Sequence, residues 1–362
     1  MKRLLFLAAC ASVMMPAAAQ TTQKFTASKA GEYALTYTLP LTAVDVTVEA
    51  QFTVRTPGEF HNYARRYLNI ADAITQPSTA VEIKSAVIGT HGEADDANRW
   101  QVQFKAGSTP YMILDEAGCL LSLNTDEIAD YPDLNLPVAV DAAPTALEVP
   151  AAREAMTQEM IQSSSTSKRA ELAAQRIFEL REMRSDLISG QADNTPPDGM
   201  SLKLALENLS AQEAALTAMF AGTTKTYTKV YTATVVPEDD EDIVGKVVSR
   251  ISLTDGFVDT DDLSGEPVTV DIRVREQATL PENEKGEAKK FPKGGVAYTI
   301  PGTADVTVYF RDRAIARSTV EMSQQGVTFG LDPALFSDKK SPSKLQLDPA
   351  TGAVLLLGPA GE

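Results

Sequence analysis

The chain has little of the chemistry that cysteine and histidine supply: its 362 residues include two cysteines and two histidines. His61 and His91 do not stand in a metal-ligand spacing such as H-x-x-x-H. Cys10 falls in the leader described below, so a mature chain keeps only Cys119 and forms no internal disulfide. We therefore predict no metal, no cofactor and no catalytic residue, and a fold that is stabilised by its apolar core.

Long apolar runs are also missing. The run Leu4–Met15 is about a dozen residues, well short of the ~20 that span a bilayer, and no later run is longer, so we predict no transmembrane segment. It follows Lys2 and Arg3 and precedes Pro16–Ala19, which is typical of a signal peptide, residues 1–19, cut after its last alanine. We predict a periplasmic, outer-membrane-associated or extracellular protein. The alternative is a lipoprotein, because Leu7–Cys10 matches a lipidation box.

Basic residues are few: 33 Lys and Arg stand against 49 Asp and Glu, a formal charge of −16. Loss of Lys2 and Arg3 with the leader leaves 31 basic residues against 49 acidic ones, a charge of −18. Nucleic acids and anionic membrane surfaces bind clustered positive charge. We therefore predict neither as a partner.

The patterns that are present predict an α+β protein. A first β-module spans 20–131, a linker rich in Pro, Ala and acid spans 132–150, a helical hairpin spans 151–222, and a second β-module spans 223–362. Apolar and polar residues alternate without a break over Val44–Val54, as in a half-buried strand. Both modules are expected to be antiparallel and sandwich-like, with the hairpin packed on one or both.

One short helix is predicted inside the first module, at about 57–68. Thr56–Glu59 matches a capping box, in which a threonine caps the helix and a glutamate three residues later reaches back. An apolar face that includes Phe60 and Ala64 would point inward. His61, Arg65 and Arg66 would point elsewhere and form a candidate contact surface.

Two longer helices are predicted in the hairpin. The first covers about 152–188 with a break at Ser163–Ser165, and the second covers about 200–220 and ends at Gly222. Both have an apolar stripe. The stripe of the second helix is Leu202, Leu206, Leu209, Leu216 and Phe220.

The two β-modules resemble each other in sequence. Tyr37–Val48 matches Tyr298–Val308 with one deletion, and each copy is followed by an Asp and Gly turn, Leu114–Gly118 in the first and Leu347–Gly352 in the second. This similarity predicts a duplication. Chance similarity between β-segments is the alternative.

Other patterns are weak guides to chemistry. Ser165–Lys168, Ser337–Lys340 and Ser341–Lys344 satisfy S-x-x-K, but their companion motifs and G-x-S-x-G are missing. The acidic segments 238–242 and 255–262 could offer oxygen ligands to calcium, or they are solvated loops between strands. Cys119, in a leucine-rich strand, is expected to be a small buried apolar residue.

Several of these segments together resemble one family. They are the Thr38–Ala43 start, the helix Pro57–Leu68, the helix Ala174–Leu187 and the Asp348–Gly352 ending. They are similar to an exported Bacteroidetes family, number 4831 in the domain-of-unknown-function series. The resemblance covers most of the mature chain and implies a Gram-negative envelope, but no activity comes with it.

These features together favour a non-catalytic role. We expect a binding or assembly protein of the envelope, which contacts another envelope protein or a glycan through edge strands or a groove between modules. The alternative is an envelope enzyme that acts on glycan or peptide with carboxylates from separate strands. Two carboxyl groups about 5 to 10 Å apart in a cleft would favour the enzyme.

Overall fold

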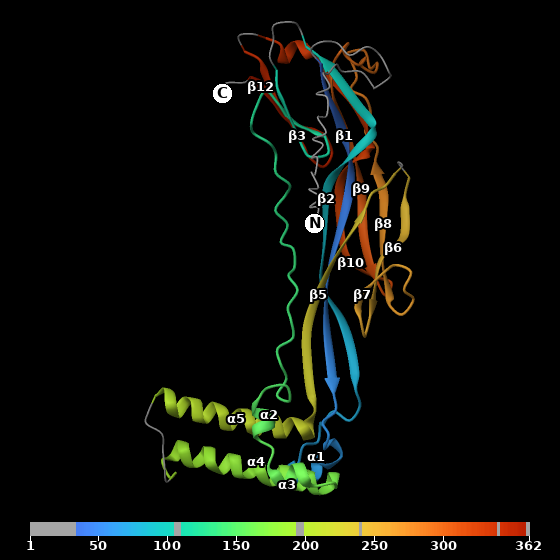
Figure 1. The fold of residues 1–362 in the computed structure, drawn as a ribbon. Helices are drawn as coiled ribbons and strands as arrows, with labels where there is room; N and C mark the ends of the chain where they lie inside the picture. Colours follow the sequence, from blue (N-terminus) through green and yellow to red (C-terminus); the bar gives the residue numbers. More distant parts are fainter. Residues whose placement is uncertain (1–33, 105–109, 193–198, 239–240, 339–340, 360–362) are drawn as a thin grey trace, which may run out of the picture.

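A computed structural model describes residues 34–104, 110–192, 199–238, 241–338 and 341–359. The predicted leader, with Cys10, lies outside the described residues. The protein has the outline of a letter L, in which a long sheet body stands on a helical foot that projects from one end (Figure 1). We call the strands β1 to β12 the sheet body and the helices η1 and α1 to α5 the helical foot.

Two antiparallel sheets share the main core of the sheet body. Strands β1 (Ala34–Thr56), β2 (Ser78–Gln103) and β5 (Thr223–Val235) form the first sheet in the order β2-β1-β5. The second sheet has the order β10-β9-β8-β6-β7, with β6 Ile243–Ser252, β7 Gly256–Val258, β8 Glu266–Glu276, β9 Val296–Phe310 and β10 Arg313–Leu331. Val44, Val46 and Val48 of β1 pack with Val270 and Val306 of the second sheet, which confirms the alternation seen in the sequence.

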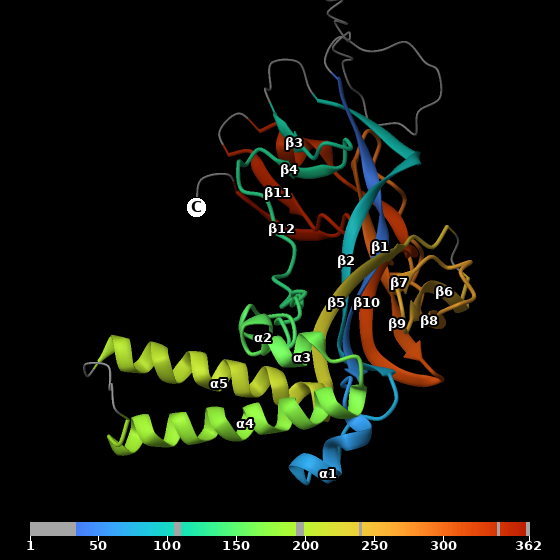
Figure 2. The ribbon, with the colours of Figure 1, turned by 60° about the horizontal axis from the view of Figure 1, so that its bottom comes forward.

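A third sheet closes the far end of the body. It has the order β12-β11-β4-β3, with β3 Met112–Leu114, β4 Leu120–Leu123, β11 Ser343–Leu347 and β12 Val354–Pro359, and the short helix η2 (Pro333–Phe336) lies beside it. A second apolar core fills the space beneath it. Strand β5 pairs with β1 and β11 pairs with β4, so strands from the two ends of the chain interleave in the same sheets (Figure 2).

The two sequence copies occupy matching positions. The backbone N–H of Thr38 donates to the carbonyl of Gly118 at 2.9 Å, and the N–H of Thr299 donates to the carbonyl of Gly352, also at 2.9 Å. Thr38 and Thr299 are equivalent in the two copies. Gly118 and Gly352 both have positive φ, a backbone conformation that glycine adopts more readily than other residues. This repeated contact supports the duplication.

The helical foot contains the predicted hairpin. Its elements are η1 (His61–Tyr63), α1 (Ala64–Leu68), α2 (Ala151–Glu154), α3 (Gln158–Gln162), α4 (Thr166–Ser189) and α5 (Met200–Ala221). The predicted break is present, because α3 ends before Ser163 and the Ser165 hydroxyl accepts the Lys168 N–H to begin α4. Gly222 has φ 84° and ends α5. None of the helices among the described residues combines the length and the apolar character that a membrane span requires.

The first short helix differs from its prediction. Regular helix begins at His61 and not at residue 57, and no side chain caps it. The Glu59 carboxylate pairs instead with Arg169 of α4 at 2.7 Å. A Cβ on Gly58 would lie 2.2 Å from the Met219 carbonyl oxygen, so the chain here packs flush against the backbone of α5. A tertiary contact has thus replaced the local capping box.

Candidate functional site

The hairpin of α4 and α5 is firmly packed only where it meets the sheet body. There Phe60 and Phe220 have ring centroids 5.3 Å apart, in a core that Ala64, Met160 and Ile177 complete. Helix α2 packs on α5 and α3 packs on α4 in the same region. The base of the hairpin therefore has a core of its own.

The outer half of the same hairpin is open. Leu180 is the last buried residue of α4 and Ala215 is the first buried residue of α5, so the segments 181–189 and 200–214 hold no buried side chain. Figure 1 and Figure 2 show both helices running on past the base, away from the sheet body. The hairpin is predicted to pack on one or both β-modules, whereas this half projects away from the sheet body.

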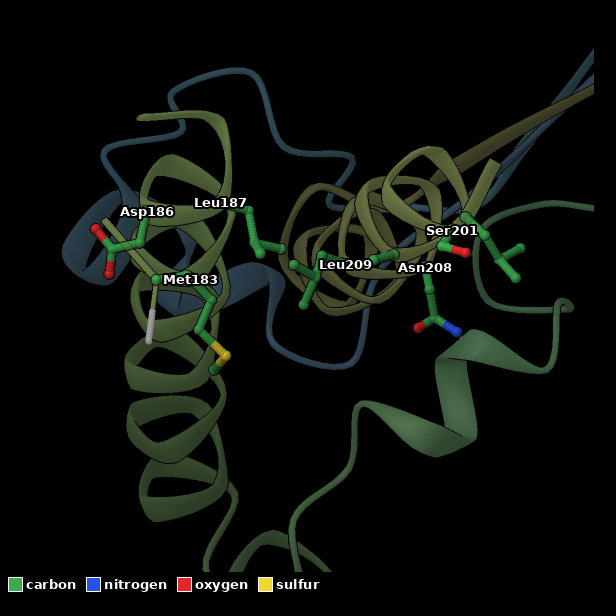
Figure 3. Close-up of a pocket in the computed structure, with 9 residues that line it drawn as sticks. Met183, Asp186, Leu187, Ser201, Asn208 and Leu209 are labelled. Carbon is green, nitrogen blue, oxygen red and sulfur yellow. The ribbon is translucent and has the colours of Figure 1, made fainter. Parts of the chain in front are cut away.

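An apolar groove runs between the two open segments. The groove has a volume of about 700 Å³. It is lined by Met183, Asp186, Leu187, Ala192, Ser201, Leu204, Ala205, Asn208 and Leu209. In Figure 3, Leu187 of α4 and Leu209 of α5 point toward each other between the helices, and Asp186 and Asn208 lie on opposite rims. Leu204 is 64% exposed and Met183 is 39% exposed. The groove therefore leaves apolar side chains in water that a bound surface could cover.

The other side of the hairpin carries ion pairs beside a second apolar hollow of about 520 Å³, which Leu202, Leu206 and Ser210 help to line. Arg181 Nε lies 2.6 Å from Glu213 Oε1, and Arg184 Nη1 lies 2.7 Å from Glu213 Oε2. The glutamate side chain is 13% exposed, while both arginines are more open to water. Because one carboxylate joins two arginines of the neighbouring helix, it holds α5 against α4 on this side.

The predicted contact residues lie at the base of the foot, outside the groove. His61 Nδ1 is 2.8 Å from the Gly58 carbonyl oxygen. Arg65 and Arg66 lie exposed on α1, and the Arg66 guanidinium stands 5.3 Å from the ring centre of Tyr67. Their role in contacts stays a prediction.

The sequence did contain a signal for the groove. Helix α5 begins with apolar residues at every second position, at Met200, Leu202, Leu204 and Leu206, so its first half is apolar on more than one face. A helix that is apolar all round is normally buried. Here the first half of α5 is exposed, although Met200 and Leu204 are apolar.

His91 belongs to a separate, smaller site on the sheet body. Its Nδ1 lies 2.6 Å from Asp45 Oδ2, and Thr234 donates its hydroxyl proton to Asp45 Oδ1 at 2.6 Å. A cavity of about 290 Å³ adjoins this pair, and segment 131–134 forms part of its wall. Asp45 is the single carboxylate among the residues that line the cavity. A second carboxylate lies beside the same imidazole, because Glu93 Oε1 is 3.8 Å from His91 Nε2.

The other candidates have local structural roles. Cys119 is buried, and burial raises its thiol pKa to about 11, so the reactive thiolate is disfavoured. Asp255 accepts hydrogen bonds from Ser252 and Thr254 of its own turn. The backbone N–H of Ser264 donates to Asp262 and lowers the pKa of that carboxyl. Across the described residues there is no group of three side chains suited to hold a metal ion.

Comparison with known proteins identifies the family but no activity. No curated protein and no solved structure matches the chain. A family model described as "Domain of unknown function (DUF4831)" matches residues 33–355, which is most of the chain. The protein therefore belongs to the DUF4831 family.

Proposed function

We propose that this is an exported protein of the cell envelope with a non-catalytic role in binding or assembly, and that it binds a helix in the groove at the open end of α4 and α5. The leader at residues 1–19 supports export. The observation that carries the binding role is the exposed apolar groove.

A helix is the occupant that the groove suits best. At the base of the hairpin, α2 and α3 already cover α5 and α4 as helices. Beyond that base the two long helices continue with apolar side chains and without a covering element among the described residues. An amphipathic helix laid in such a groove presents anchors at i, i+3, i+4 and i+7. It would complete the helical bundle that the base begins.

Binding would remove apolar side chains of the groove from water. Complete burial of a leucine or methionine side chain contributes roughly 1.5–3 kcal/mol. Leu204 and Met183 are the most exposed large apolar side chains of the groove, at 64% and 39%. Burial of their exposed fractions contributes about 1.5–3 kcal/mol together, before the cost of association is subtracted.

A photo-crosslinking residue at position 204 tests this proposal in the host cell. The matched control is the same residue at position 263, because Leu263 is a leucine of similar exposure, 80%, in a loop of the sheet body. We expect a discrete adduct from position 204, mapped by mass spectrometry to a helical segment, and none from position 263. No discrete adduct from position 204 would refute a binding role for the groove.

A further inference from the structure

We infer that the occupant of the groove is the same groove of a second copy of this chain, so that two hairpins form a four-helix bundle. This inference rests on the proposed function, since it names the partner at that site. In such a dimer each surface packs on its own equivalent, and a two-fold axis relates the copies. Helix hairpins of this kind are the halves from which four-helix bundles are built.

The two rims of the groove match each other chemically. The rim on α4 carries the Asp186 carboxylate, an acceptor. The rim on α5 carries Ser201 and Asn208, whose hydroxyl and amide groups are donors. The Asn208 Oδ1 already accepts a hydrogen bond from Gln212 at 2.7 Å, so the NH₂ side of this amide is the group suited to a carboxylate.

A two-fold axis parallel to the hairpin brings the α4 rim of each copy against the α5 rim of the other. It places α4 of one copy against α5 of the other, with all neighbouring helices antiparallel. Asp186 and Asn208 line the same stretch of groove, so the axis brings each Asp186 opposite the Asn208 of the second copy, twice. The leucines of both grooves then meet in the middle, which is the arrangement of an apolar core with a polar rim.

Charge does not oppose this contact, although the whole chain is strongly acidic. The basic side chains near the groove are paired within the hairpin: Arg181 and Arg184 with Glu213, and Lys203 with Glu207 at 3.8 Å. The sheet body stands on the α5 side of the foot in Figure 1, so the axis directs the two bodies in opposite directions. Repulsion between separated exposed charges is screened beyond about 10 Å at ordinary salt.

Paired cysteine variants of the purified mature chain test the arrangement. Asp186→Cys and Asn208→Cys are made in separate preparations with tags of different size, and each is oxidised alone and after mixing. We expect a disulfide-linked heterodimer only in the mixture. The axis brings position 186 of one copy next to position 208 of the other, whereas the two copies of the same position lie on diagonally opposite helices of the bundle. Leu263→Cys mixed with Asn208→Cys is the control and should form no such product.

Sedimentation of the unmodified chain and of Leu204→Glu completes the test. We expect a dimer whose dissociation constant rises about tenfold or more in the variant, since a leucine leaves an apolar interface and a charge enters it. Helical circular dichroism should be equal in both, because Leu204 packs on no core in the monomer. A monomeric unmodified chain, or a mixture without the heterodimer, would overturn the second copy as partner. The photo-crosslink from position 204 separates the two proposals: an adduct with a different protein leaves the groove's binding role standing.

Discussion

A matched pair of leucine truncations in α5 examines whether the hairpin is packed at its base and open at its end. Leu216 is fully buried, whereas Leu204 is 64% exposed, and both lie on the same helix. The surrounding helix is the same in both cases, so the difference between Leu216→Ala and Leu204→Ala reports burial and not helix propensity.

The expected magnitudes follow from that burial. Leu216→Ala removes buried methyl groups beside Phe60 and Phe220 and should cost about 2–5 kcal/mol in the free energy of unfolding. Leu204→Ala leaves no cavity and should stay within about 0.5 kcal/mol, as surface substitutions usually do. With the usual entropy of unfolding per residue, a loss of 3 kcal/mol lowers the Tm of a chain of about 340 residues by roughly 4 °C.

Urea unfolding followed by circular dichroism at 222 nm, which reports the helical foot, is the suitable assay. The chain should be dilute, so that self-association through the groove does not stabilise the foot. Equal losses for the two variants would refute the reasoning, because they would mean that the outer half of α5 is as tightly packed as the base.

Three further predictions concern other parts of the molecule. Gly58→Ala should destabilise the foot by about 1–3 kcal/mol, because its Cβ would meet the backbone of α5, while Gly358→Ala, with nothing within 4 Å, should be neutral in the same unfolding assay. Cys119 should resist iodoacetamide in the folded chain until the pH approaches its raised pKa of about 11, and alkylation at neutral pH would contradict its burial. The Cys119 thiol ionises at a lower pH in the unfolded chain than in the folded chain. The free energy of unfolding should therefore fall as pH rises from about 8.5 toward 11, and Cys119→Ala should weaken this pH dependence. Arg65→Ala with Arg66→Ala should change the unfolding free energy by less than about 0.5 kcal/mol, since both are exposed, and should leave the crosslink from position 204 intact; a lost crosslink would place α1 in the contact surface.

Local patterns in the sequence were sufficient for the secondary structure of several segments. The alternation over Val44–Val54 predicts β1, because a strand exposes successive side chains to opposite faces. Ser163–Ser165 predicts the break before α4, and Gly222 predicts the end of α5, because caps and breaks depend on a few adjacent residues. The Asp and Gly turns at Leu114–Gly118 and Leu347–Gly352 predict the repeat, because turn chemistry also depends on a few adjacent residues.

Contacts between distant segments decided the rest. The sequence places Leu206 and Leu216 on one stripe, and only the packing of Phe60 and Phe220 determines that the second is buried and the first is not. The capping box at Thr56–Glu59 failed because Arg169, 110 residues away, attracts the glutamate. Periodicity shows which side of an element is apolar, whereas the surface that covers it is set by the tertiary fold.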